Sequence, residues 1–103
     1  MAKTIPNLLT VHEIQLLLGQ RLKALRLLAS YRRETLANRS GVSVGSLKRF
    51  ETIGEVSLKN LVRLAQALDR VSELTSLFAL PDAASLSELE ARTEKPMPKR
   101  GKI

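Results

Sequence analysis

The sequence contains no cysteine, no tryptophan and a single histidine, His12. Disulfide bonds and thiolate metal sites are therefore excluded, and a lone histidine does not complete a metal or nucleophile site. None of the five glycines forms a phosphate-binding loop or a dinucleotide-binding spacing. We therefore expect no catalytic residues, no metal and no cofactor, and we interpret the chain as a protein without enzymatic activity.

Aromatic residues make up only 3% of the 103 residues, although hydrophobic residues make up 44%. The core must therefore consist mainly of leucine and other aliphatic side chains, which favours packed helices in an all-α fold. No apolar run approaches the roughly 18 residues that cross a bilayer. Residues 1–10 also lack the apolar stretch of a secretory signal. These absences predict a cytoplasmic protein with no membrane partner.

The formal net charge of +7 is concentrated in residues 21–49, where Glu34 is the only acid. Basic and acidic side chains balance in the segments on either side. The basic residues of the middle segment are Arg21, Lys23, Arg26, Arg32, Arg33, Arg39, Lys48 and Arg49. Clustered Lys and Arg favour a polyanionic partner, because binding to phosphates releases counterions. A basic face that interacts only with solvent is the alternative.

Hydrophobic periodicity and capping residues predict five helices and no strand. The first begins at the capping-box pattern of Thr10 and Glu13 and ends near Leu28. The others are expected at about 32–40, 44–51, 58–68 and 71–80. We therefore divide the chain into an N-terminal arm (1–9), one domain (10–80) and a mostly flexible C-terminal extension (81–103). We expect the extension to form a short amphipathic helix at Ser85–Thr93 and a disordered basic tail at Glu94–Ile103.

Residues 33–51 have the features of two short helices joined by a tight turn. The small Ala37 allows close approach of the second helix, Gly41 ends the first, and Ser43 can cap the second. Val42 and Leu47 fill the angle between the two helices. This combination predicts a helix-turn-helix.

At these residues the sequence resembles the Xre family of Cro-like and phage-repressor-like helix-turn-helix proteins. The residues that carry the resemblance, within roughly Leu18–Leu80, are Leu36-Ala37, Gly41-Val42-Ser43, Leu47, Glu51 and the Leu61–Leu68 helix. More narrowly, the chain is similar to HipB-type antitoxins, which are often paired with a HipA-like kinase toxin and repress their own operon. The resemblance implies a five-helix, dimeric repressor of a palindromic DNA operator. A stand-alone or phage-type regulator without a toxin is the alternative.

The resemblance implies that the helix at about 44–51 enters the major groove. Its expected reading surface comprises Ser43, Val44, Gly45, Ser46, Lys48 and Arg49. Arg49 is the best candidate base reader, because a guanidinium can bond guanine at two acceptors, and a phosphate contact is the alternative. Val44 can touch a thymine methyl group, and Ser43 is either a cap alone or also a phosphate donor. Gly45 either lets the backbone approach the bases or has no role in binding.

Two departures from the family pattern concern the expected phosphate contacts. The second helix opens with Arg32-Arg33, where the family usually has Ser or Thr and then Gln, so phosphate anchoring should be stronger and the helix start uncapped. Ile53 stands where the family has glycine and Gly54 follows, which affects the loop before the expected phosphate ligands Lys59 and Asn60.

The resemblance also implies a buried ion pair between Arg26 and Glu51. The alternative for Arg26 is a phosphate contact.

Dimerisation is expected through the fifth helix, with Leu74, Leu77, Phe78 and Leu80 as its surface. A second candidate surface is formed by Leu8, Leu9, Ile14 and Leu18. For some of these leucines, the alternative is that they close the core of the monomer. Two other functional classes are an RNA-binding module and a protein-sequestering adaptor. RNA readers usually stack bases on aromatic side chains, but Tyr31 and Phe50 are both expected to be buried, which favours DNA.

Overall fold

The computed structural model describes residues 8–81 as five helices. They are α1 (Val11–Leu28), α2 (Arg33–Ser40), α3 (Val44–Ile53), α4 (Leu58–Ala67) and α5 (Val71–Thr75). These residues contain no strand, so the predicted all-α class is confirmed. The expected helix at Ser85–Thr93, the expected tail at Glu94–Ile103 and residues 1–7 of the expected arm lie outside the described residues.

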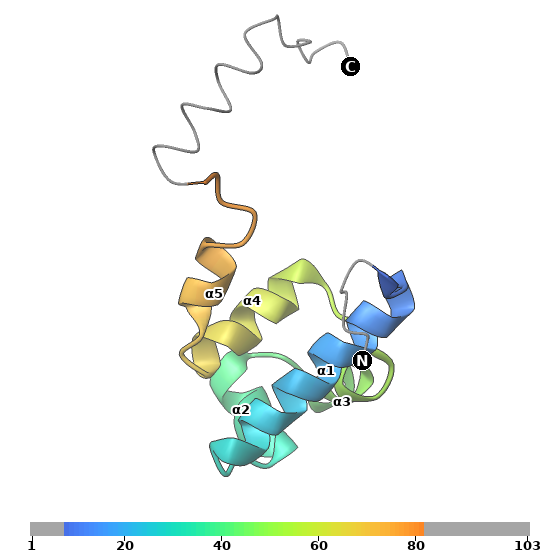
Figure 1. Cartoon of the computed structure of the whole chain (residues 1–103). Coiled ribbons are helices and arrows are strands. Elements are labelled where there is room, and N and C mark those ends of the chain that lie inside the picture. Colours follow the sequence, from blue (N-terminus) through green and yellow to red (C-terminus); the bar gives the residue numbers. More distant parts are fainter. Residues whose placement is uncertain (1–7, 82–103) are drawn as a thin grey trace, which may run out of the picture.

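The helices are arranged around the crossing of α1 over α3 (Figure 1). α2 contacts both α3 and α4, and α5 contacts α4. In Figure 1, α5 lies on the side of the molecule away from α3. One face of α3 therefore remains uncovered by the other helices.

The helix starts follow the capping residues seen in the sequence. Thr10 Oγ1 accepts a hydrogen bond from the Glu13 amide at 3.0 Å, and the Thr10 amide donates to Glu13 Oε1 at 2.9 Å, which completes the predicted capping box. Arg32 precedes α2 without a side-chain cap, as expected. Ser43 caps α3 by accepting from the Ser46 amide at 3.0 Å.

Two glycines end helices in the left-handed conformation that favours glycine. Gly41 ends α2 with φ 81°, as predicted, and its amide bonds the Ala37 carbonyl at 2.8 Å. Gly54 ends α3 with φ 78°. α3 therefore extends to Ile53, two residues beyond the predicted end at Glu51. A Cβ on Gly54 would lie 2.6 Å from the Gln15 carbonyl carbon, so this turn packs directly on α1.

The core lies where α1 to α4 meet. Its buried side chains are Leu22, Leu36, Val42, Leu47, Phe50 and Leu64. Phe50 is 2% exposed, and aliphatic side chains surround it, as the low aromatic content predicted. Tyr31 was expected to be buried but is only partly so, because it packs at the edge of this cluster with the Arg39 guanidinium 4.9 Å from its ring centre.

α5 is shorter than predicted, since it ends at Thr75 and not near Leu80. The hydroxyl of Ser76 donates to the carbonyl oxygens of Ser72 and Glu73, and back-bonding of this kind slightly destabilises a helix. Phe78 has φ 59°, which is incompatible with a continuing right-handed helix. The expected dimer residues Leu77 and Phe78 therefore lie beyond α5, 54% and 94% exposed.

Gly19 and Gly45 both lie inside helices but have opposite surroundings. A Cβ on Gly19 would clash with the carbonyl oxygen of Phe50, so this glycine allows α1 to approach α3 closely. A Cβ on Gly45 would meet no atom within 4 Å. The first glycine is required by packing, and the second is not.

We predict that Gly19→Ala destabilises the fold and that Gly45→Ala stabilises it. In an open helical position alanine gains about 1 kcal/mol over glycine. At Gly19 the forced separation of α1 from α3 should cost about 1–3 kcal/mol, as overpacking does. Urea denaturation of both variants gives the free energies of unfolding. Equal effects of the two substitutions would contradict the close packing at Gly19.

Candidate nucleic-acid interface

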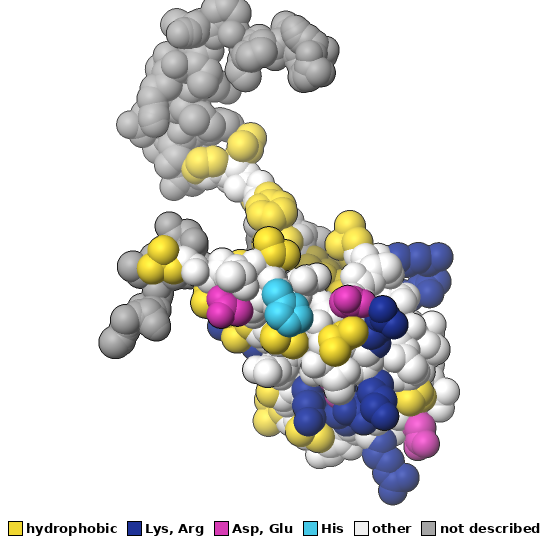
Figure 2. All heavy atoms as spheres, turned by 90° about the vertical axis from the view of Figure 1, so that its right-hand side faces the viewer, with side chains coloured by type: hydrophobic (Ala, Val, Ile, Leu, Met, Phe, Trp, Pro, Cys, Tyr) yellow, Lys and Arg dark blue, Asp and Glu magenta, His cyan; other side chains and the backbone are white. Residues whose placement is uncertain are grey.

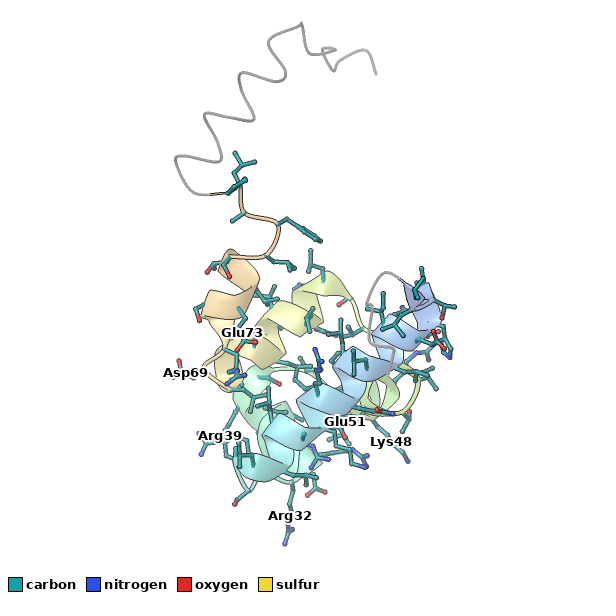
Figure 3. All side chains as sticks on the ribbon, viewed as in Figure 1. Arg32, Arg39, Lys48, Glu51, Asp69 and Glu73 are labelled. Atoms are coloured by element: carbon teal, nitrogen blue, oxygen red, sulfur yellow. The ribbon has the colours of Figure 1, made fainter. Side chains whose placement is uncertain are left out.

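α3 has one buried face and one exposed face. Leu47, Phe50 and Glu51 are buried against the rest of the domain. The opposite face carries most of the expected reading residues: Val44, Gly45, Lys48 and Arg49 are exposed, and Ser46 is partly buried. Figure 3 shows Lys48 on the outer side of α3 and Glu51 on the side toward α1. Burial of one α3 face thus fixes the orientation of the other.

The capping contacts at the start of α3 engage the two serines of the expected reading surface. Ser43 Oγ accepts from the Ser46 amide and also donates to Ser46 Oγ at 3.0 Å. The structural role expected for Ser43 as a helix cap is therefore present.

A basic groove lies beside the start of α3. It is lined by Lys23, Arg26, Arg32, Arg33, Glu34, Val44 and Lys48, and its volume is about 590 Å³. Arg32 extends away from the body of the domain (Figure 3). Lys23, on α1, was not among the expected site residues. Lys23 contributes to the net charge of residues 21–49. Its spacing in the sequence does not indicate that it lines this groove together with Arg32 and Lys48.

The space-filling view agrees with this distribution of charge. Several Lys and Arg side chains gather on the lower part of the face that Figure 2 shows. This is the side of the molecule toward which α3 lies in Figure 1. The basic groove and the exposed α3 face together offer positive charge to a polyanion.

The buried carboxylate of Glu51 accepts hydrogen bonds from two arginines, Arg26 and Arg33. Arg26 Nε and Nη2 donate to Glu51 Oε2 and Oε1 at 2.7 and 2.9 Å, and the two side chains are 7% and 0% exposed. Arg26 Nη1 also donates to the Tyr31 carbonyl at 3.0 Å. The ion pair implied by the family resemblance is therefore formed through Nε and Nη2, and the bond to Tyr31 engages the third guanidinium nitrogen of Arg26.

Arg33 also bonds Glu51, which the sequence did not indicate. Its Nε donates to Oε1 at 3.0 Å, and the side chain is 31% exposed. Both Arg32 and Arg33 were expected to be phosphate ligands. Of the two, only Arg33 bonds Glu51. The separation of 18 residues between Arg33 and Glu51 carries no helical periodicity that could have revealed the contact.

Burial of the Glu51 carboxyl raises its pKa, but the hydrogen bonds and positive charges of Arg26 and Arg33 outweigh this effect. The pKa of Glu51 is therefore lowered from its ordinary value of 4.5. Glu51 remains ionised at neutral pH in spite of its burial.

A second hollow lies at the other end of the exposed α3 face. Ser46, Arg49, Glu55, Val56, Ser57 and Asn60 line it. Ser57 caps α4 by accepting from the Asn60 amide at 3.0 Å, and Lys59 is exposed on the first turn. The expected phosphate ligands Lys59 and Asn60 thus lie at the N-terminus of a ten-residue helix, where the helix dipole favours anions.

Arg49 is paired with Glu55 in this second hollow. Arg49 Nε and Nη2 both donate to Glu55 Oε1, at 2.9 and 2.6 Å. The two side chains are 63% and 52% exposed. Glu55 was not among the expected site residues.

A family model described as helix-turn-helix, of the Cro/C1 type, matches residues 22–74. The match begins inside α1, includes α2, α3 and α4 completely, and ends in α5. The chain belongs to this helix-turn-helix family. The family is one of DNA-binding, non-enzymatic domains, and this helix-turn-helix protein is a DNA-binding regulator of transcription. No curated protein and no solved structure matches the chain.

Within residues 8–81, no helix combines the length and the apolar character needed to cross a bilayer. In the same part of the chain, no three His, Cys, Asp or Glu side chains are grouped as a metal site would require. His12 is exposed on the first turn of α1.

We predict that the helix-turn-helix domain loses stability in acid because Glu51 becomes protonated. A carboxylate with a lowered pKa contributes stability that is complete above its ordinary pKa and is lost as the pH falls through the lowered value. At neutral pH, Glu51→Gln should lower the free energy of unfolding by about 3–5 kcal/mol, since Arg26 is left buried without its partner. The stability of the variant should also depend less on pH below the ordinary carboxyl pKa of 4.5 than that of the unaltered protein.

Denaturant titrations at several pH values measure both effects. Glu34→Gln, which removes an exposed acid of the basic groove, is the matched control and should behave like the unaltered protein. Equal acid sensitivity of Glu51→Gln and the unaltered protein would contradict the assignment.

Proposed function

We propose that this helix-turn-helix protein is a sequence-specific repressor that inserts α3 into the major groove of a palindromic operator. The observation that carries the proposal is the exposed α3 face with Lys48 and Arg49, bordered by the basic groove on one side and the start of α4 on the other. A helix whose free face is flanked by two phosphate-binding regions suits a duplex, whose two backbones border each groove.

The proposal assigns base contacts to the exposed α3 face and phosphate contacts to its surroundings. Val44, Gly45, Ser46, Lys48 and Arg49 are the proposed base-facing residues. The proposed phosphate ligands are Arg32, Arg33, Ser43, Lys59 and Asn60, to which we add Lys23. Arg32 and Lys23 are both exposed on the basic groove, which supports their assignment to the backbone.

The surroundings of Tyr31 and Phe50, the two aromatic residues in the segment from α1 to α3, favour DNA over RNA. Phe50 is 2% exposed, and Tyr31 is partly buried with Arg39 over its ring. Neither ring is free to stack on an unpaired base, which is the usual mode of RNA recognition. An adaptor that only sequesters a protein is disfavoured by the concentration of charge around α3.

We further propose a cytoplasmic, homodimeric protein that represses its own operon as a HipB-type antitoxin with a HipA-like kinase toxin. The support is the family resemblance, together with the exposed apolar residues Leu77, Phe78 and Leu80 beyond α5. A stand-alone or phage-type regulator is the alternative. Co-expression with the product of the neighbouring gene, followed by purification of one tagged partner, distinguishes the two, because only an antitoxin retains a kinase-like partner at defined stoichiometry.

The proposed division of the chain assigns DNA binding to residues 10–80, with residues 1–9 and 81–103 as extensions. The five described helices and the family match both lie within residues 10–80, which supports this division.

We predict that Arg32→Ala and Arg49→Ala impair DNA binding in different ways. Arg32→Ala should weaken binding to all duplexes alike and reduce the slope of log Kd against log salt by about one, as loss of a phosphate contact does. Arg49→Ala should instead relax the choice of base at one position of each half-site. Titrations with the DNA upstream of the gene and with a scrambled duplex, each at two salt concentrations, measure both quantities.

Arg39→Ala, which removes an exposed charge from the last turn of α2 away from Lys48 (Figure 3), controls for the loss of one positive charge. It should change neither the salt slope nor the base preference. Binding that is identical for the upstream and scrambled duplexes at both salt concentrations would overturn sequence-specific repression.

We also predict that Leu77→Glu gives a folded monomer. Leu77 and Leu74 line an apolar groove with Leu18 and Leu61, and Leu77 is 54% exposed, so a second copy can cover this surface. Two linked half-sites about 34 Å apart need such a dimer, so cooperative operator binding should be lost with it. Analytical ultracentrifugation measures the oligomeric state.

The control is Leu27→Glu, which introduces the same charge at an equally exposed leucine of α1. It should remain dimeric. An unaltered protein that is monomeric at micromolar concentration and protects a single half-site would overturn the dimer.

A further inference from the structure

Glu55 follows the glycine that ends α3, and its backbone position is fixed by the packing of that turn. The Gly54 amide bonds the Phe50 carbonyl at 2.9 Å, and the Gly54 Cα packs against the α1 backbone at Gln15. Two residues beyond Glu55, Ser57 begins α4 with its capping hydrogen bond. The Glu55 carboxylate thus projects from a short connection held at both ends.

The hydrogen bonds to Glu55 occupy one edge of the Arg49 guanidinium and leave a second edge available for a further contact. Glu55 Oε1 accepts from Nε and Nη2, which form the side edge of the guanidinium. An arginine has five N–H donors, so the end edge formed by Nη1 and the second N–H of Nη2 stays available. A bidentate contact to guanine O6 and N7 needs two parallel donors of this kind.

We propose that Glu55 is a positioning residue that holds Arg49 for recognition of guanine and directs it away from phosphate. This inference rests on the proposed function, and it decides between the two contacts open to Arg49. The Glu55 carboxylate repels a phosphate and cancels the charge of Arg49. The pair is therefore attracted only weakly to the phosphate backbone of DNA. A neutral pair with a free donor edge is suited to a base edge.

The pair contributes little to folding, because both side chains are more than half exposed and solvent screens their attraction. Its effect lies in the orientation of a side chain that otherwise samples many rotamers. A fixed guanidinium loses less conformational freedom when it binds a base, so preorganisation strengthens the specific complex more than the nonspecific one.

The domain contains a second exposed arginine–glutamate ion pair, which lies away from the proposed DNA-binding face. Arg70 Nε and Glu73 Oε2 are 2.6 Å apart, and their side chains are 46% and 60% exposed. Figure 3 shows Glu73 on α5, well away from Lys48. Glu73→Gln therefore removes the same charge from a similar pair outside the proposed DNA-binding face. Because Glu73 borders the groove of Leu74 and Leu77, analytical ultracentrifugation first checks that this variant keeps the oligomeric state of the unaltered protein.

The test begins with selection of duplexes by the full-length protein from a random pool, which gives the preferred operator. Kd is then measured for this duplex and for duplexes with each guanine replaced in turn. The unaltered protein, Arg49→Ala, Glu55→Gln, Glu73→Gln and the double variant Arg49→Ala/Glu55→Gln are compared at two salt concentrations. Thermal melting checks that all are folded.

We expect Glu55→Gln to reduce the preference for one guanine by about tenfold, within the range of a bidentate arginine contact. The affected position should be the one that Arg49→Ala also relaxes. Nonspecific binding should instead become tighter and its salt slope steeper by about one, because a negative charge is removed and Arg49 becomes free to bind phosphate. Glu73→Gln should change neither quantity, and Glu55→Gln should have no effect on base preference in the Arg49→Ala background.

A Glu55→Gln variant with an unchanged guanine preference, in a protein whose Arg49→Ala variant loses it, overturns the positioning role and leaves the proposed function intact. Equal effects of Glu55→Gln and Glu73→Gln overturn it too, since they reduce the result to net charge. If the unaltered protein selects no sequence, the proposed function fails and this inference fails with it.

Discussion

The buried carboxylate of Glu51 is the interaction on which the orientation of α3 depends. It receives two hydrogen bonds from Arg26 of α1 and one from Arg33 at the start of α2. Leu47 and Phe50 bury the same face of α3 in the close-packed apolar core. The bonds from the two arginines are directional. The apolar contacts and the ion pairs therefore act together to determine which face of α3 points outward.

The bonds to Glu51 also affect how much of the positive charge of the segment is available to DNA. Residues 21–49 carry a net charge of +7, but Arg26 and Arg33 both bond the single buried acid Glu51, and Arg49 is paired with Glu55. Among the described residues, Lys23, Arg32 and Lys48 remain as exposed cations around the basic groove. The number of charges in the segment therefore overstates the charge available to DNA. Phosphate attraction and base selection are assigned to different basic residues.

Local signals in the sequence predicted much of the fold, whereas contacts between distant residues were accessible only in part. The capping box at Thr10, the turn at Gly41 and the cap at Ser43 each depend on neighbouring residues, and all three are present. The Arg26–Glu51 pair came from family resemblance. The Arg49–Glu55 pair depends on how a loop closes on α1, for which the sequence carries no periodic signal. The end of α5 was misjudged because leucine spacing continues beyond the point where Ser76 and Phe78 stop the helix.

The apolar surface beyond α5 and the exposed α3 face are separated in space, and this separation bears on regulation. α5 contacts α4, and it lies across the domain from α3 (Figure 1). A protein bound at Leu77 and Phe78 would therefore leave α3 free to enter a major groove. In the proposed dimer that protein is a second copy, and it sets the distance between two copies of α3 without covering the DNA-binding face. Because Glu51 joins α3 to Arg26 of α1 and Arg33 of α2, the distance between two copies would also fix the direction in which each α3 faces the DNA.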